Sequence, residues 1–483
     1  MSDPVVIRLD CPAHVRAKAR YVFDTLLAAR RVPVAYDDTG DRAPNVVYTA
    51  EFAQVPKNAL GVFCSARAWD FFGEAADVGR AATVQGLRVV FDEFCENPNT
   101  PDAISFDLVA NAFYFLSSWS ERVPSERDRG TRALYADSVF RRLDIPQTVV
   151  DDYASLLMGA LSKSAPTVLD RISGTRRWLD GSAFAVVISH DEDFIPRNLA
   201  DTITMGAKSV LRQLITHRSP MDAIRVAGAF IGSLARGRNP YLTVPELVRK
   251  EQARGVRASY QIAVANRHPN DVTYRIEDKA VQSYLRPIVD AGFDVCLHGS
   301  YRSTERAEWY ADEVRTLTEH FAQPRGSRQH YLSFDYDTLF AAQEHAGIAY
   351  DMSIGYPDAC GSRVGFSHPY HPYNLAEDRP YRVLEIPLVL MDVTLRTYLG
   401  LSAPDARERI KAELELLRRA GGCGSIVWHP ILFGGARDPG FDDLYWELID
   451  LTQGLGGWAG DARSIHDALR TVLRQYPSFP PSQ

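Results

Sequence analysis

Two carboxylates, Asp191 and Asp193, close an apolar run that extends from Phe184 to Ile188. Such a run ending in acids is typical of a buried strand that delivers its carboxylates to the edge of an α/β sheet or barrel where chemistry takes place. Strand alternation puts both acids on the same side. Because two adjacent carboxylates repel each other, the pair needs a cation, a shared proton or an arginine. The alternative is a strand end whose acids start a turn or cap a helix.

Three further predicted strand ends carry polar side chains. His298 follows the apolar run that begins at Phe293, Arg328 and His330 lie two residues apart, and His429 follows a short apolar stretch. If the strands are parallel, these side chains converge on one edge with the two aspartates. A single histidine of this kind is more often a hydrogen-bonded structural residue, but four polar strand ends in series are much less expected by chance.

These residue types suit metal-assisted hydrolysis. A carboxylate and two imidazoles are typical ligands of a divalent metal such as Zn²⁺, with one position left open for water. The remaining carboxylate could then act as a base on the water. An arginine could keep that base ionised, and a further histidine could protonate a leaving group.

Candidate substrate-binding residues flank this series. The segment from Gly361 to Tyr373 concentrates histidines and tyrosines around Arg363, and aromatic and guanidinium groups on a loop suit stacking on sugar rings or pairing with phosphate or carboxylate. A surface loop with incidental aromatics is the alternative. Trp428 and Tyr301 could form walls that face a sugar, although residues next to strand ends are more often part of the core.

The elements that must position these residues alternate from Phe184 onward, which predicts βα units around a parallel sheet or barrel. We expect strands over Phe184–Ser189, Arg257–Val264, Phe293–Leu297, Leu384–Met391 and Ser425–Trp428. We expect helices over Pro245–Arg254, Lys279–Ala291, Thr304–Phe321, Tyr336–His345 and Asp405–Ala420, with a long helical excursion over Asn198–Gly237.

A separate α/β unit precedes them. Short strands are predicted at Val5–Leu9, Val32–Tyr36, Val46–Thr49, Gly61–Cys64 and Leu87–Phe91, and helices at Pro12–Arg31, Phe106–Trp119 and Val149–Leu161. The polar stretch Ser173–Gly181 marks the boundary. We therefore predict an accessory domain over residues 1–178, with a role in support or substrate presentation, and a catalytic domain over 179–483.

Composition sets the class of protein. A chain of 483 residues is too long for one ordinary core. The net charge of −7 and the lack of a Lys/Arg block argue against a nucleic-acid partner. Six scattered cysteines without a CxxC pair indicate free thiols in a reducing compartment. With no signal peptide and no apolar run of about 18 residues, we expect a cytoplasmic protein without a membrane span. The oligomeric state stays open.

From Phe184 to Tyr476 the series of motifs resembles the polysaccharide deacetylase superfamily (carbohydrate esterase family 4). The resemblance implies that Asp191 is the catalytic base and Asp193 a metal ligand, as in members that space the two as Asp-x-Asp. It also implies that His298 is a metal ligand. The family's second motif normally ends in a second ligating histidine, and here Arg302 stands in its place.

The other motifs match by position. The resemblance implies that Arg328 pairs with the base and that His429 is the general acid. Two possibilities follow from the missing ligand. His330 lies on the same side of an extended segment as Arg328 and could supply the imidazole. Otherwise the site binds metal weakly or not at all, like a subset of the superfamily that cleaves cyclic amides, with Arg302 replacing the cation.

The chain further resembles a bacterial group of this superfamily in which an α/β domain precedes the deacetylase-like one. The matching segments are Phe106–Leu108 to Phe115–Trp119, Arg328–Leu332, Gly347–Gly355 and Gly361–Tyr370. The implied fold is α/β: a distorted (β/α) barrel of the polysaccharide deacetylase type preceded by a smaller α/β domain.

The expected function is that of a metal-dependent hydrolase, which removes an N-acyl group, acetyl above all, from an amino sugar or glycoconjugate. The expected metal is a divalent ion, Zn²⁺. Asp191, Arg328 and His429 are the expected catalytic residues, with Asp193, His298 and His330 as metal ligands. The backbone N–H of Tyr331 could help to stabilise an oxyanion. The expected substrate-binding residues are Tyr301, Arg302, Arg363, Tyr331 and Trp428. The alternatives are a metal-independent hydrolase of another C–N bond and an inactive carbohydrate-binding scaffold.

Overall fold

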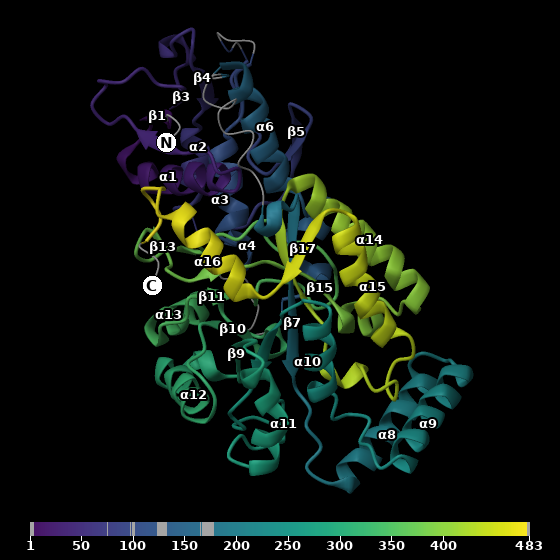
Figure 1. The fold of residues 1–483 in the computed structure, drawn as a ribbon. Helices are drawn as coiled ribbons and strands as arrows, with labels where there is room; N and C mark the ends of the chain where they lie inside the picture. Colours follow the sequence, from purple (N-terminus) through teal and green to yellow (C-terminus); the bar gives the residue numbers. More distant parts are fainter. Residues whose placement is uncertain are drawn as a thin grey trace. The chain divides into compact units, whose positions relative to one another are not determined.

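The computed structural model describes residues 4–480 apart from 75, 97, 99–101, 123–132, 165 and 167–177. The chain separates into two compact units (Figure 1). The first takes in residues 1–178, 362–385 and 467–483, and the second takes in 179–361 and 386–466. Two later segments thus group with the first unit, and the division into domains at residue 178 stays a prediction. Residues 173–177 of the expected boundary lie outside the described residues.

The first unit is built on a parallel four-stranded sheet of order β2-β1-β3-β4. Its strands are β1 (Val5–Asp10), β2 (Val34–Tyr36), β3 (Val46–Thr49) and β4 (Leu60–Phe63). Two short antiparallel ribbons pair β5 (Ala82–Val84) with β6 (Leu87–Val89), and β12 (Tyr373–Asn374) with β13 (Arg379–Pro380). Its helices are α1 (Ala13–Ala28), α2 (Ala66–Phe71), α3 (Leu108–Leu116), α4 (Trp119–Arg122), α5 (Val139–Arg142), α6 (Val149–Ser164) and α16 (Ala462–Leu473), which runs on from the second unit.

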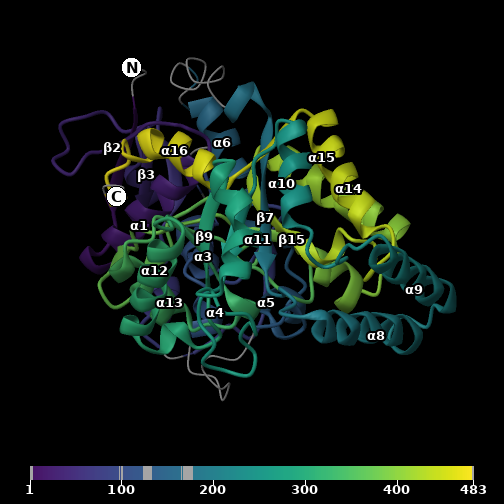
Figure 2. The same cartoon turned by 60° about the horizontal axis from the view of Figure 1, so that its bottom comes forward.

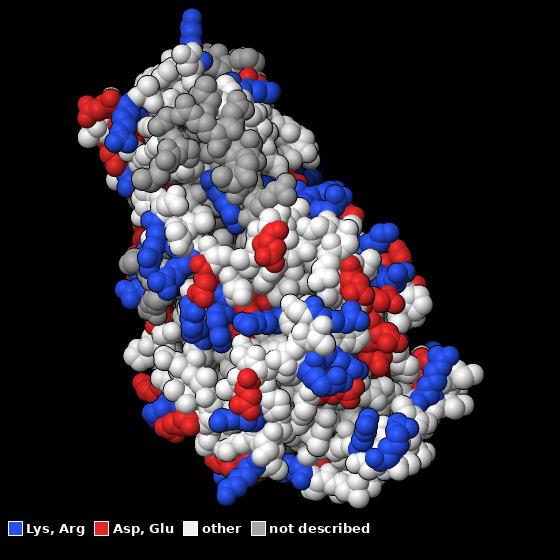
Figure 3. All heavy atoms as spheres, viewed as in Figure 1, with Lys and Arg blue, Asp and Glu red and all other residues white. Residues whose placement is uncertain are grey.

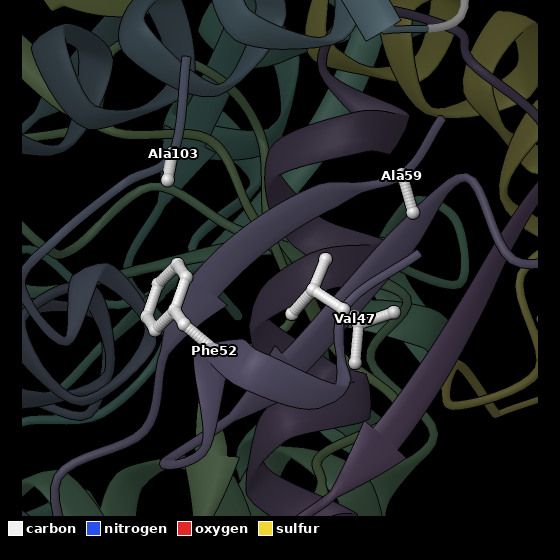
Figure 4. Close-up of a cluster of buried hydrophobic side chains, with 5 residues drawn as sticks. Val47, Phe52, Ala59 and Ala103 are labelled. Atoms are coloured by element: carbon white, nitrogen blue, oxygen red, sulfur yellow. The ribbon is translucent and has the colours of Figure 1, made fainter. Parts of the chain in front are cut away.

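The apolar content of these elements explains the unit's core. One cluster of buried side chains joins Val47 of β3 to Phe52 of a short 3-10 helix and to Val55, Ala59 and Ala103 from loops (Figure 4). Every residue of α3 is buried, which explains why its sequence is apolar at nearly every position. The predicted buried helix is therefore confirmed, although it is shorter than expected.

The second unit contains a curved, open parallel sheet. Its strands follow the order β11-β10-β9-β8-β7-β16-β15, and β17 pairs with the start of β7. These strands are β7 (Phe184–Glu192), β8 (Ser259–Ile262), β9 (Asp294–Gly299), β10 (Gly326–Gln329), β11 (Tyr350–Asp351), β15 (Leu388–Met391), β16 (Cys423–Val427) and β17 (Gly457–Gly460). The predicted α/β class is confirmed, and the sheet is a half-barrel rather than a closed barrel.

Helices connect these strands (Figure 2). They are α8 (Leu199–Ile215), α9 (Pro220–Ala235), α10 (Val244–Ala253), α11 (Lys279–Asp290), α12 (Ala307–His320), α13 (Tyr336–Ala346), α14 (Ala403–Ala420) and α15 (Phe441–Gly454). The long excursion expected after β7 is two helices, because Ser219 caps α9 and Pro220 occupies its first turn. Among the described helices, none has both the length and the apolar character of a membrane span.

All seven residues of β7 from Phe184 to His190 are completely buried, as expected for a central strand covered on both faces. Its neighbours run parallel to it, so the carboxyl ends of β7, β9, β10 and β16 lie at one edge of the sheet. The four polar strand ends therefore converge on one edge of the sheet, as predicted.

The six cysteines are free thiols, as their spacing predicted. Cys11, Cys64, Cys296, Cys360 and Cys423 are buried, and Cys95 is partly exposed.

Candidate metal centre

Three side chains from the ends of β7, β9 and β10 meet at the carboxyl edge of the sheet. Asp193, His298 and His330 each offer one ligand atom, and these three atoms lie within 4.8 Å of one another. The Nε2 atoms of His298 and His330 lie 3.1 and 3.4 Å from Oδ1 of Asp193. These are the three residues expected to ligate a metal, and a carboxylate with two imidazoles is a donor set that suits Zn²⁺.

Two atoms of this group are buried polar atoms whose hydrogen-bonding capacity is unused. Among the described residues, neither Oδ1 of Asp193 nor Nε2 of His298 has a hydrogen-bond partner. Nδ1 of His298 lies 3.0 Å from the carbonyl oxygen of Arg328, which assigns its proton to Nδ1 and leaves the Nε2 lone pair directed at the group. Because buried polar atoms are rarely left unsatisfied, these residues fit a bound cation.

Asp191 has a different partner. Its Oδ1 accepts a hydrogen bond of 2.6 Å from Nη1 of Arg328, and both side chains are buried. The guanidinium also donates to the Met352 carbonyl at 2.9 Å and to Oγ of Ser189 at 2.8 Å, which holds it in one orientation. Burial alone would raise the pKa of Asp191, but the positive charge of Arg328 holds that pKa below its usual range.

His429, which follows β16, faces the carboxylate of Asp193. Its Nε2 lies 3.4 Å from Oδ2 of Asp193. Its Nδ1 lies 2.7 Å from Oδ1 of Asp392, whose Oδ2 also accepts a hydrogen bond from the His429 backbone N–H at 2.8 Å. Burial favours the neutral imidazole, but the carboxylates of Asp392 and Asp193 raise the pKa of His429 well above its usual value.

Asp392 is a site residue that the sequence analysis missed. It directly follows β15 in the chain, as Asp193 directly follows β7. The same signal, an acid that closes an apolar strand, was therefore present at both positions.

An aromatic rim borders the candidate ligands. The ring of Tyr331 lies 4.6 Å from that of His330 and 5.9 Å from that of Tyr301, and its side chain is 46% exposed. Tyr301 stacks on His268 at 4.6 Å with an interplanar angle of 16°. Tyr331 and Leu332 both have positive φ, of 60° and 53°, a conformation that residues with side chains seldom adopt. The ring contacts with His330 and with each other place Tyr331 and Tyr301 at the edge of the site.

Trp428 does not form a wall of the site. Its side chain is completely buried, and its indole N–H donates to the Phe441 carbonyl at 3.1 Å. The prediction of a sugar-facing tryptophan is wrong because the ring belongs to the face of the sheet that packs on α15.

The two other arginines also lie elsewhere. Arg363 belongs to the first unit, where its buried guanidinium forms an ion pair with Glu121, so it is not the exposed substrate ligand that we expected. Arg302 follows β9 and has a side chain that is 56% exposed, with Nε 3.4 Å from Glu305. It therefore does not occupy the position of a metal ligand or of a buried cation.

Comparisons with known proteins give limited matches. A sequence family described as a family of unknown function (DUF7033) matches residues 10–166, which lie in the first unit. No curated protein matches the chain. A solved structure from Mycobacterium smegmatis, described as a candidate polysaccharide deacetylase, is similar over 64% of this chain and 95% of its own, with 18% sequence identity and a TM-score of 0.41. A likeness of this extent assigns neither fold nor activity to this chain.

Proposed function

We propose that the second unit is a metal-dependent hydrolase of the polysaccharide deacetylase type, which removes an N-acyl group, acetyl above all, from an amino sugar or glycoconjugate. The observation that carries the proposal is the pair of unsatisfied buried atoms on Asp193 and His298, in a group whose ligand atoms, with that of His330, lie within 4.8 Å of one another. A binding scaffold would have no need for an ion-paired base on one side of that point and an oriented histidine on the other.

Asp193, His298 and His330 would hold the metal. A Zn²⁺ ion bound there would supply a Lewis acid that polarises the acyl carbonyl and favours ionisation of water. The substitution of His330 for the missing second histidine is supported by its Nε2, which lies 3.4 Å from Oδ1 of Asp193, the same oxygen that Nε2 of His298 approaches at 3.1 Å. Arg302 has no role in this arrangement.

Asp191 would take a proton from the attacking water. Its Oδ1 is held by Arg328, whereas its Oδ2 lies 3.9 Å from Nε2 of His298 and so faces the group of candidate ligands. The arginine keeps the carboxylate ionised, which a base requires. The backbone N–H of Tyr331 would help to stabilise the developing oxyanion.

His429 would protonate the departing amine. Asp392 accepts a hydrogen bond from Nδ1–H, and this fixes the ring so that Nε2 points into the site. Tyr301 and Tyr331 would lie against the sugar, because aromatic faces pack well on the apolar faces of sugar rings.

The test combines activity with metal content. We expect Asp191→Asn to lower deacetylation of a panel of N-acetylated amino sugars by about 10²–10⁴-fold while the bound metal, measured by plasma mass spectrometry, is unchanged. We expect His330→Ala to lose the metal, with Tyr331→Ala as the matched control that keeps it. An active preparation free of metal would contradict the proposal and favour a metal-independent hydrolase. Glycan binding that Asp191→Asn does not alter, without turnover, would favour a scaffold.

A further inference from the structure

The hairpin formed by α8 and α9 is apolar on its outside. Eight large apolar side chains of the two helices are between 46% and 67% exposed: Leu199, Ile203, Leu211, Leu214 and Ile215 of α8, and Met221, Ile224 and Ile231 of α9. The two helices lie side by side at one end of the second unit in both views (Figures 1 and 2). An exposed set of this size is unusual for a surface that faces only water.

The inside of α8 is polar. Its four buried residues are Thr202, Gly206, Ser209 and Gln213. The amide of Gln213 donates to Asp438 at 2.9 Å and to the Arg437 carbonyl at 2.7 Å, and it accepts from Arg396 at 2.9 Å. A helix that packs on a protein core normally shows the reverse pattern, with apolar residues inside. The face of α8 that packs on the protein is therefore its polar one, and the apolar residues lie on the face that points away.

Positive charge surrounds the apolar residues. Residues 197–238 contain seven Lys or Arg and two Asp, although the whole chain has a net charge of −7. Lys208, Arg218, Arg236 and Arg238 are exposed and form no ion pair within the described part of the chain. In Figure 3, blue Lys and Arg side chains are scattered over white surface where Figure 1 places α8 and α9.

We infer that the α8–α9 hairpin docks on an anionic membrane surface, with its apolar residues in the headgroup region and its basic residues on the lipid phosphates. Exposed helices that carry both apolar and basic residues are typical of interfacial binding. A second copy of the hairpin is a poorer occupant, because it would bring two surfaces of like charge together. The inference does not rest on the proposed function.

Docking there would bring the candidate metal centre to the lipid. Only residues 194–198 separate Asp193 from α8. Arg212 of α8 also contacts Thr397, which lies beside the exposed Tyr398 and Leu399 that follow β15. The carboxyl edge of the sheet would therefore be held beside the headgroups.

The test is flotation of the full chain with vesicles. We expect binding to vesicles of equal parts phosphatidylcholine and phosphatidylglycerol but not to phosphatidylcholine alone, and loss of that binding at high salt. We expect Ile215→Ser/Ile224→Ser and, separately, Lys208→Gln/Arg218→Gln each to weaken binding about tenfold or more. Phe94→Ser, an exposed aromatic of the first unit, and Arg257→Gln/Lys279→Gln are the matched controls, and they should bind as the native chain does.

A second measurement needs no variant. Vesicles containing phosphatidylglycerol should slow backbone hydrogen exchange in residues 199–235 and leave α11 and α12 unchanged. Absence of binding at low salt, equal binding by the hairpin variants, or protection confined to segments other than the hairpin and residues 397–399 would overturn the inference. So would dimerisation in solution that Ile215→Ser/Ile224→Ser abolishes, because the occupant would then be a second copy.

Discussion

Asp191 and Asp193 are chemically identical and two residues apart, yet their surroundings separate them. Arg328 holds one oxygen of Asp191 at 2.6 Å, whereas Oδ1 of Asp193 faces two imidazoles and lacks a hydrogen-bond partner among the described residues. The difference arises from partners at the ends of β9 and β10 rather than from the acids themselves. It is the reason for proposing a base at one position and a ligand at the other.

Asp392 offers a test of the orientation of His429. We expect Asp392→Asn to lower kcat about 10–100-fold with little change in KM, because the imidazole loses the carboxylate that sets its tautomer and its angle. Metal content should stay the same, since Asp392 is outside the group of candidate ligands. Steady-state kinetics on the deacetylase panel checks this, with Asp312→Asn, at a partly exposed position of α12, as control. A change in KM alone would argue against a positioning role.

Arg328 is also a stability residue. We expect Arg328→Met to lower the free energy of unfolding by about 3–5 kcal/mol, because it leaves the buried Asp191 without its partner. The double variant Asp191→Asn/Arg328→Met should recover part of that loss, since the uncompensated charge is gone. Urea denaturation followed by circular dichroism measures both. Equal destabilisation of the single and double variants would show that the ion pair is not the cause.

Much of the geometry at this scale could be predicted from residue order. Acids, histidines and an arginine at the ends of parallel strands have to meet, and six of them do. Asp392 was missed although it directly follows a strand that was correctly predicted to end at Met391. Trp428 and Arg363 were misplaced because residue type alone does not say whether a side chain faces a site, the core or an ion-pair partner.

At the scale of elements, the second unit contains a close approach between two loops that only glycine permits. A Cβ on Gly434 would lie 1.8 Å from the carbonyl oxygen of Pro240, in the segment that follows α9. By contrast, a Cβ on Gly454, the last residue of α15, would meet nothing within 4 Å.

This pair of glycines provides a matched experiment. We expect Gly434→Ala to destabilise the protein by about 1–3 kcal/mol, because the Pro240 backbone must move. We expect Gly454→Ala to be neutral or stabilising by up to about 1 kcal/mol, since alanine favours the helix. Thermal unfolding of both variants measures the difference. Similar behaviour of the two would show that the Pro240 segment moves aside freely.

Strand and helix positions were largely predictable because apolar periodicity is a local property. The break between α8 and α9 was signalled by Ser219 and Pro220, but the apolar content of both helices masked it. The outward orientation of those apolar residues could not be predicted, because periodicity identifies an apolar face without saying what covers it.

For the whole molecule, buried carboxyl groups of the first unit link stability to pH. Burial raises the pKa of Asp24 to about 6, and those of Asp107 and Asp151 to about 7. A raised pKa means that the folded state holds protons that the unfolded state releases. The stabilisation is complete below about pH 4 and is lost as the pH rises through 6 to 7.

We therefore expect the first unit to unfold more readily at about pH 8 than at about pH 5. Each linked proton contributes a slope of about 1.4 kcal/mol per pH unit between its two pKa values. Asp151→Asn should lower the number of protons linked to unfolding by about one, because the amide does not titrate. The variant should still fold, since its amide oxygen can accept the Ser367 backbone N–H that now lies 3.1 Å from the carboxylate. Scanning calorimetry across this pH range provides the measurement. If stability changes as steeply with pH in the variant as in the native chain, other groups cause the effect.

The distribution of thiols has a practical consequence for spectroscopy. Five of the six cysteines are buried, and Cys95 in the first unit is the partly exposed one. A maleimide dye should therefore label the native chain at a single position without prior removal of other cysteines. That label would report on the first unit alone, without signal from the second.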